Sequence, residues 1–241
     1  GSFSSVTLFD PNDLTVSNPS GGTPALDVTV GTSLTLGTGT YDSLDVDVSS
    51  GASVGQIAGV SVVNATTITS SNTSATTVNL SNTSNNFNTI TFVESGGSFE
   101  AVTVADATGL IVGDIPVSGT GDITVSANAG LTVNGTVQTA TGNIDLDADA
   151  DSLGIGLFSL AATTGDLSSA GDLTLNGADF DFGAGSAMTA GGVFDLVFTQ
   201  AGDLCLGLSA GGAGCQINLD NADLGVLTGV TTDLELDNSG S

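Results

Sequence analysis

The chain has 241 residues, a formal net charge of −26, and neither Lys, Arg nor His. A chain this acidic repels phosphates and anionic lipids, so nucleic-acid binding and membrane-surface binding are not expected functions. It contains no run of about 18 apolar residues, so we also expect no membrane insertion. Glycine is frequent (35 residues) and proline scarce (4 residues), and this composition predicts strands and turns rather than helices.

Short runs of alternating apolar and polar residues follow one another along the chain and predict β-strands. In chain order they begin at residues 13 (DLTVSN), 25 (ALDVTV), 33 (SLTLG), 43 (SLDVDV), 123 (ITVSA), 131 (LTVNG), 143 (NIDLDA), 172 (DLTLNG), 179 (DFDFG), 193 (VFDLVF), 217 (INLD) and 233 (DLELD). Alternation predicts that Asp145 and Asp147 face outward. It places these apolar side chains in the core: Ile123, Val125, Leu131, Val133, Ile144 and Leu146.

Several of these runs start with Gly followed by Asp or Asn, as at 121–122, 142–143 and 165–166. Recurrence at intervals of about 20 residues without helical segments predicts a parallel β-helix, an all-β solenoid with about 22 residues per coil and about 11 coils. We expect a single domain over 1–241, with atypical terminal coils at 1–24 and 203–241. The Phe-rich stretch 180–198 is expected to widen the core.

The segment 87–151 contains the units VTVADATGLIVGDIPVSG at 102 and GDITVSANAGLTVNG at 121, and GDLTLNGADF at 171 continues the pattern. These units resemble the filamentous-haemagglutinin type of repeat found in large bacterial surface adhesins and giant surface proteins. The resemblance implies a right-handed β-helix and an extracellular, cell-surface location. Because this chain lacks Lys and Arg, unlike the usual member of that family, no binding residue is transferred to it.

Four aspartates alternate with small or apolar residues in GNIDLDADADSLG, residues 142–154: Asp145, Asp147, Asp149 and Asp151. On a strand they would share one face at intervals of about 6.5–7 Å. One interpretation is a solvated outer face with Leu146, Ala148 and Ala150 inside. The other is an irregular or inter-subunit calcium site, because Ca²⁺ binds oxygen ligands alone, and cations that bridge neighbouring subunits would then control assembly. Smaller copies of the arrangement occur at 45/47 and at 179/181.

Two cysteines, Cys205 and Cys215, flank the turn-prone segment 209–214. A hairpin centred near residue 210 would pair them directly and permit a disulfide near the C-terminal end. Separately, the Asn-x-Ser/Thr pattern of possible glycosylation sites occurs at Asn64, Asn72, Asn79, Asn82 and Asn134. The alternative for these asparagines is a structural role at solenoid corners.

Catalysis is not expected, because a serine nucleophile or a lyase needs a basic side chain that this chain lacks. The remaining enzymatic alternative is a hydrolase that uses only aspartates, but the carboxylates are too many and too widely spread for any pair to be diagnostic. The open ends of a β-helix expose unpaired strand edges, and no capping helix is evident in the sequence. We therefore expect a structural or adhesive protein of the cell surface that assembles end to end into a rod or filament. The alternative is a carbohydrate- or receptor-binding adhesin module that works as a monomeric rod.

Overall fold

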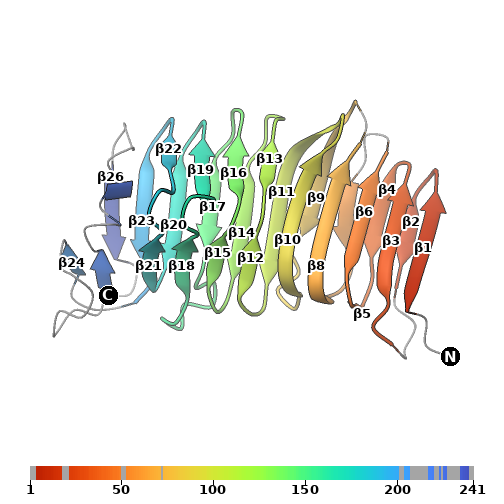
Figure 1. The fold of residues 1–241 in the computed structure, drawn as a ribbon, viewed down its shortest axis with the longest axis horizontal. Helices are drawn as coiled ribbons and strands as arrows, with labels where there is room; N and C mark the ends of the chain where they lie inside the picture. Colours follow the sequence, from red (N-terminus) through yellow and green to blue (C-terminus); the bar gives the residue numbers. More distant parts are fainter. Residues whose placement is uncertain are drawn as a thin grey trace.

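The structure is a computed structural model and describes residues 4–17, 22–49, 53–71, 73–200, 204–206, 217–219, 223, 225–226 and 234–238. The chain winds into a parallel β-solenoid of about 8 turns (Figure 1). The fold class predicted from the sequence is confirmed, with fewer turns than expected. Every pairing within the stacked sheets is parallel, for example β1 with β3 and β14 with β17.

Two long sheets run along the solenoid and take one strand from successive coils. The first is ordered β1 (Ser5–Asp10), β3 (Ala25–Val30), β6 (Leu44–Val48), β8 (Val60–Ser70), β10 (Asn86–Glu94), β12 (Leu110–Val112), β15 (Leu131–Val133), β18 (Leu157–Leu160) and β21 (Asp179–Phe182), with β5 (Gly39–Tyr41) also paired to β8. The second is ordered β2 (Leu14–Val16), β4 (Ser33–Leu36), β7 (Ser53–Gln56), β9 (Ala75–Leu80), β11 (Ser98–Asp106), β14 (Ile123–Ala127), β17 (Ile144–Asp147), β20 (Leu173–Gly177), β23 (Phe194–Phe198) and β26 (Leu234–Asn238).

A third sheet appears only in the C-terminal half, where it is ordered β13 (Ile115–Val117), β16 (Thr136–Thr139), β19 (Asp166–Ser169) and β22 (Met188–Ala190). The coil before it consists of two nine-residue strands, β10 and β11, whereas the next has three short strands, β12, β13 and β14. The solenoid thus changes from two-sided to three-sided coils partway along its length (Figure 1).

Register partners in the second sheet measure the length of each coil. Leu34 and Val54 lie 20 residues apart, and Ile123 and Ile144 lie 21 apart, close to the predicted repeat. The step from Ile144 to Leu173 takes 29 residues, because that coil contains an insertion after β17. The long corner formed by this insertion, residues 148–156, is called the β17–β18 loop below.

The core is one continuous apolar column that runs along the solenoid from Val16 to Val226. Each inward-facing residue predicted by alternation is buried: Ile123, Val125, Leu131, Val133, Ile144 and Leu146. Asp145 is exposed and Asp147 is half-buried, on the outer face of the same strand. Alternation therefore gives the correct register for β14, β15 and β17.

Aromatic residues pack against one another in the core of the coils near the C-terminal end, and a widening of the core by 180–198 stays a prediction. The Phe180 ring lies 5.0 Å from that of Phe198 and 5.8 Å from that of Phe182, measured between ring centroids. Phe158, one coil earlier, packs against both Phe180 and Phe182 at 6.0 and 6.3 Å. Tilted and edge-on pairs of this kind add stabilisation beyond their buried area.

The C-terminal end departs from the expectation that no helical cap is present. Asp223, Gly225 and Val226 are helical, and Val226 belongs to the core column. The Asp223 carboxylate accepts the backbone N–H of Phe182 at 2.8 Å, at the last strand of the first sheet.

The expected hairpin around residue 210 is also wrong. β24 (Leu204–Leu206) and β25 (Ile217–Leu219) form a two-stranded sheet whose strands are parallel, with Cys205 opposite Asn218. A chain segment that returns to the same face after a coil pairs in parallel, whereas the symmetric turn-like composition of 209–214 suggested an antiparallel pair.

The same substitution at two leucines in one coil tests the inward and outward assignment. Leu146 is fully buried in β17, and Leu153 in the following loop is 69% exposed. We expect Leu146→Asp to lower the free energy of unfolding by about 4 kcal/mol, because it buries an unpaired carboxylate. Leu153→Asp should change it by less than about 0.5 kcal/mol. Urea denaturation followed by circular dichroism compares the two, and equal losses would contradict the register.

Candidate functional site

The aspartate run 145–151 does not form the single acidic face that alternation suggested. β17 ends at Asp147, and the chain then turns into the β17–β18 loop. Asp149 is only 1% exposed, and Ala150 faces solvent, the reverse of the predicted arrangement. The alternation of residue types continues beyond the end of the strand. It therefore predicted Asp149 and Asp151 on β17, whereas both lie in the loop that follows.

The buried Asp149 carboxylate accepts hydrogen bonds from donors within the protein. Its Oδ2 accepts the backbone N–H of Gly154 at 2.9 Å and the Thr199 hydroxyl at 2.5 Å. Its Oδ1 accepts a longer bond from the backbone N–H of Ile155 at 3.5 Å. These three donors give the buried side chain hydrogen-bond partners from the loop and from a distant coil.

The two neighbouring aspartates also bind backbone groups within their own turns. Asp147 Oδ1 accepts the N–H of Asp149 at 2.9 Å, and Asp151 Oδ1 accepts the N–H of Leu153 at 3.2 Å. These are the local turns that Asp side chains favour, two residues apart. Asp145 Oδ1 instead accepts the Asn176 amide of the next coil at 3.3 Å.

Across the described part of the chain, no three ligand-type side chains come together in an arrangement that could hold a metal ion. The four carboxylates at 145–151 therefore do not form a preformed calcium centre with one another. Calcium binding by these residues stays a prediction.

The Gly-Asp and Gly-Asn pairs form a hydrogen-bonded ladder at one corner of the solenoid. Asp122 Oδ1 accepts the N–H of Asn143 at 2.7 Å, and Asn143 Oδ1 accepts the N–H of Asp172 at 2.8 Å. Asp172 Oδ1 in turn accepts the N–H of Val193 at 2.8 Å. Each acidic or amide side chain thus binds the backbone one coil further on, and the ladder borders a shallow pocket of about 250 Å³.

The glycine that precedes each ladder residue permits this close stacking. A Cβ atom on Gly142 would lie 2.0 Å from the carbonyl oxygen of Gly121, so no other residue fits there without displacement. The third sheet repeats the device, because Asp114 Oδ1 accepts the N–H of Thr136 and Asp166 Oδ1 accepts the N–H of Ala187, both at 2.8 Å. Many of the acidic residues therefore serve as acceptors for backbone donors at corners.

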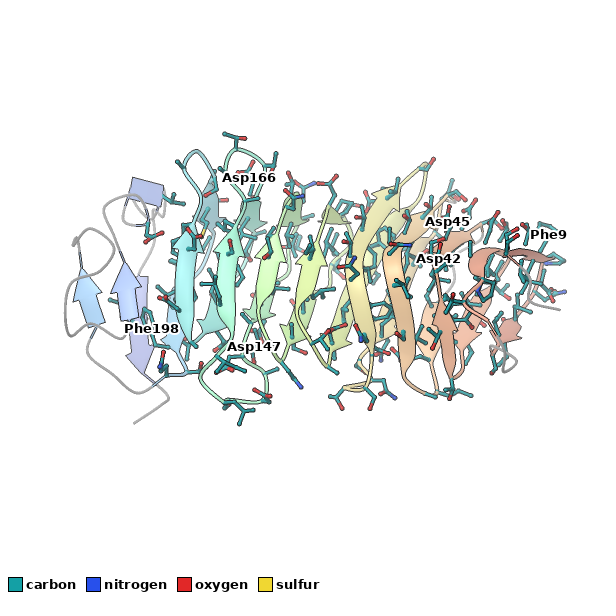
Figure 2. The ribbon with its side chains drawn as sticks, turned by 60° about the horizontal axis from the view of Figure 1, so that its bottom comes forward. Phe9, Asp42, Asp45, Asp147, Asp166 and Phe198 are labelled. Carbon is teal, nitrogen blue, oxygen red and sulfur yellow. The ribbon has the colours of Figure 1, made fainter. Side chains whose placement is uncertain are left out.

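Acidic residues also face one another on the outer surface of the first sheet, where β3 pairs with β6. Asp27 lies directly opposite Asp45, and Asp47 follows on the same face; Figure 2 shows the Asp42 and Asp45 side chains in this region. Asp47 accepts a short hydrogen bond from the Ser71 hydroxyl, and Asp42 accepts one from the Asn64 amide at 2.9 Å. The second small copy of the run lies on β21, where Asp181 is exposed and Asp179 is half-buried.

Four aspartate side chains have a pKa above the ordinary value for aspartate: Asp45, Asp106, Asp145 and Asp147. Burial raises the pKa of Asp106 above its ordinary value, despite hydrogen bonds from Phe87 and Thr108. Desolvation raises the pKa of Asp145 and of Asp147, and the charges of Asp145, Asp149 and Asp151 add to the effect at Asp147. Desolvation and the charges of Asp27 and Asp47 raise the pKa of Asp45.

The possible glycosylation sites occupy different environments. Asn64, Asn79 and Asn134 are exposed and Asn82 is half-buried, whereas Asn72 lies outside the described residues. The side chains of Asn79 and Asn82 accept the backbone N–H two residues on, at 3.2 and 2.9 Å, and Asn134 accepts the Thr164 hydroxyl at 3.2 Å. These contacts are those of structural turns, the alternative left open by the sequence, and modification stays a prediction.

The proposed disulfide partner Cys215 lies outside the described residues, and the parallel pairing of Cys205 with Asn218 removes the hairpin on which the disulfide prediction rested.

A group of exposed aliphatic side chains after the aspartate run was not predicted from the sequence. The β17–β18 loop and the start of β18 expose three aliphatic side chains, with Leu153 69%, Ile155 67% and Leu157 42% exposed. The signal in the sequence was the segment SLGIGL directly after the aspartate run, which interrupts the regular repeat. Its alternating Leu and Ile residues were not singled out, because the interpretation of this region rested on the aspartates that precede it.

No protein-family model matches this chain, and neither the curated proteins nor the solved structures contain a significant match. The likeness to filamentous-haemagglutinin repeats therefore stays a prediction. In the part of the chain that the structure describes, none of the helical residues forms a helix long and apolar enough to cross a membrane.

Stability should rise as the pH falls from 7 towards 5. The pKa values of Asp45, Asp106, Asp145 and Asp147 are raised in the folded state. The folded protein therefore binds protons more readily than the unfolded chain in this window, and acidification favours it. Asp13, whose pKa is lowered by the Ser33 and Thr32 hydroxyls, acts in the opposite sense but is fully exposed. Calorimetry should show a higher Tm at pH 5 than at pH 7.

The control for this pH dependence is the double variant Asp145→Asn with Asp147→Asn, which retains an acceptor oxygen at both positions. It should have a higher Tm than the wild type at pH 7 and a flatter pH profile. A wild-type Tm that falls steadily between pH 7 and pH 5 would contradict the raised pKa values.

The Asp149 carboxylate should be required for the conformation of the β17–β18 loop. Asp149→Ala leaves the N–H groups of Gly154 and Ile155 and the Thr199 hydroxyl without their acceptor, at a cost of about 1–3 kcal/mol. We expect thermolysin, which cuts before large apolar residues, to nick this variant before Leu153 or Ile155 under conditions that leave the wild type intact.

Asp151→Ala serves as the control, since Asp151 is exposed and its side chain accepts a hydrogen bond from the Leu153 N–H within the same turn. It should resist thermolysin as the wild type does. Mass spectrometry of the fragments locates the cut, and equal nicking of the two variants would mean that Asp149 does not hold the loop.

Proposed function

We propose that this protein is a non-catalytic structural rod of an extracellular surface and that it associates with further copies through its N-terminal end. The observation that carries the proposal is the open edge formed by β1 and β2. Among the described strands, β1 pairs only with β3 and β2 pairs only with β4. An unpaired strand edge is a ready template for another strand.

The orientation of β1 identifies which backbone groups are available. Ala25 N–H binds the carbonyl of Ser4 at 3.1 Å, and Gly31 N–H binds the carbonyl of Asp10 at 2.8 Å. Because successive residues in a strand direct their backbone groups to opposite edges, those of Ser5, Thr7 and Phe9 face away from β3.

Apolar side chains accompany this edge. Val6, Leu8 and Leu14 pack on the core column but are only partly buried. Phe9 is 75% exposed and lies at the extreme end of the solenoid (Figure 2). A second copy that covers this end would remove apolar surface from water and satisfy strand hydrogen bonds at once.

The two ends of the solenoid differ. At the C-terminal end Asp223 caps the Phe182 N–H and β26 adds a further strand to the second sheet. Among the described strands β26 pairs only with β23, so it offers a second edge, with which the N-terminal edge of another copy would pair in an end-to-end rod. An extracellular role accords with the lack of Lys and Arg, which leaves trypsin-like proteases no cleavage site.

A second candidate function is a carbohydrate- or receptor-binding module that works as a monomeric rod. It is favoured by an open groove of about 490 Å³ at the step from two-sided to three-sided coils. Carboxylates of Glu94 and Asp114, the Gln138 amide, the Thr136 hydroxyl and the apolar Pro116 ring line this groove. Such a mixture of acceptors around an apolar surface suits hydroxyl-rich ligands.

Proline at position 7 tests the rod proposal. Thr7→Pro removes an N–H that faces away from β3, so the fold should be retained while pairing with a second copy is blocked. We expect light scattering and negative-stain microscopy to show concentration-dependent association of the wild type and monomers of this variant, with similar Tm values.

Thr7→Val is the matched control, because it retains the N–H and should associate as the wild type does. If the wild type is monomeric at about 100 μM and physiological salt, association through this edge is refuted. Short monodisperse rods would then favour the binding-module alternative.

A further inference from the structure

The β17–β18 loop is an insertion at one corner of an otherwise regular solenoid. The equivalent corners between the second and first sheets hold three residues at 107–109 and 128–130, and one residue at 178. This corner holds nine residues, 148–156. Its two ends meet, since a Cβ on Gly156 would lie 1.8 Å from the carbonyl oxygen of Ala148. A compact loop with adjacent ends is frequently a recognition element.

The loop is held in one conformation at an energetic cost. Asp149, an almost fully buried carboxylate in a chain without cations, binds the N–H groups of Gly154 and Ile155 and the hydroxyl of Thr199. Ser152 has a left-handed backbone with φ of 55°, which is unfavourable for a residue other than glycine. Burial of the charge and this strain are compatible with folding only because the surrounding contacts fix the loop.

What the loop presents to solvent is apolar. Leu153, Ile155 and Leu157 project from it or its exit, each substantially exposed. Leu157 also lines an adjoining pocket of about 280 Å³, together with Ile111, which is 38% exposed. The remaining lining is apolar or glycine except for Thr132. Exposed apolar side chains thus follow one another along the chain from Leu153 to Leu157, which lines the pocket, and exposed apolar surfaces of this kind mark interaction sites.

Charge indicates the kind of partner. Asp145 and Asp147 precede the loop and Asp151 lies within it, and no positive side chain exists anywhere in the chain to offset them; Figure 2 shows Asp147 beside the loop. A second copy would bring the same carboxylates and a net charge of −26 against this surface. A partner with basic residues around an apolar anchor complements both its charge and its apolar centre.

We propose that the β17–β18 loop and the adjoining pocket form a docking surface for a basic amphipathic peptide segment of another protein. Leu153 and Ile155 are the central contacts, and the surrounding aspartates attract the basic side chains. Asp149 acts as a positioning residue that holds the apolar contacts ready before the partner arrives, which lowers the entropy cost of binding. This surface lies on the side of the solenoid and does not depend on the N-terminal edge.

Binding of a labelled synthetic amphipathic Leu/Lys helix peptide, followed by fluorescence anisotropy in 0.15 M NaCl, tests the proposal. The test variant is Leu153→Ser with Ile155→Ser, which leaves every charge in place. The matched control is Ile57→Ser with Val63→Ser, which removes two aliphatic side chains that are 72% and 53% exposed elsewhere on the rod. A peptide in which Ser replaces each Leu reports purely electrostatic binding.

We expect the wild type and the control variant to bind the Leu/Lys peptide with equal affinity, and the loop variant to bind it about ten-fold more weakly. The Ser/Lys peptide should not distinguish the three proteins. Asp149→Ala, which retains the apolar side chains but releases the loop, should also weaken binding.

Equal affinities for the loop variant and the wild type overturn the proposal, as does an equal loss in the control variant. Loop-dependent self-association, or loop-dependent binding to phosphatidylcholine vesicles in place of the peptide, would assign the surface to a different occupant and overturn it as well. Thr7→Pro should bind the peptide like the wild type, so failure of the rod proposal and failure of this one are distinguishable.

Discussion

Parallel stacking of one coil directly on the next is the constraint on which the rest of this structure depends. Successive strands lie about 4.8 Å apart, so whatever occupies a position in one coil closely approaches its counterpart in the next. Inside, this produces columns of Val, Leu, Ile and Phe. At corners it excludes side chains where backbones meet, as at Gly142, and requires acceptors for N–H groups that the sheets do not pair.

The same spacing explains how so acidic a chain stacks without basic side chains. The corner ladder is Asp122, Asn143, Asp172, so a neutral amide separates two carboxylates that would otherwise be neighbours. In the third sheet Asp114 and Asp166 are separated by the coil that contains Thr136. Where two aspartates do occupy adjacent coils, as Asp27 and Asp45, the charge of Asp27 contributes to a raised pKa at Asp45. Aspartate is thus tolerated as a backbone acceptor and is unfavourable as a stacked charge.

The features that could be predicted from the sequence are those that recur in every coil because the coils stack directly on one another. Alternation identified the buried face of β14, β15 and β17 because the core there is narrow and regular, and the Gly-Asp spacing gave the coil length. Prediction failed wherever the repeat is interrupted. At Asp149 the alternation of residue types continued after the strand had ended. Around Cys205 a turn-like composition suggested a hairpin, although the pairing is parallel.

Non-local contacts account for the remaining failures. Nothing near Asp149 in the sequence shows that Thr199, fifty residues later, supplies a donor to its carboxylate. The role of Asp223 at the Phe182 N–H is equally remote, since the two are 41 residues apart. Within the candidate site, residue types could therefore be recognised in advance, but their partners and burial could not.

A regular solenoid offers few distinct surfaces, because each coil presents nearly the same face as its neighbours. Specific recognition then depends on the places where regularity is broken: the unpaired edge at β1 and β2, the step to three-sided coils and the β17–β18 loop. At the loop the break requires a buried carboxylate and a left-handed serine. If the loop only connected two strands, a three-residue corner such as 128–130 would do so without a buried carboxylate or a left-handed serine, and the protein would be more stable. A binding partner for Leu153 and Ile155, which this loop conformation holds exposed, would explain why the less stable corner is present.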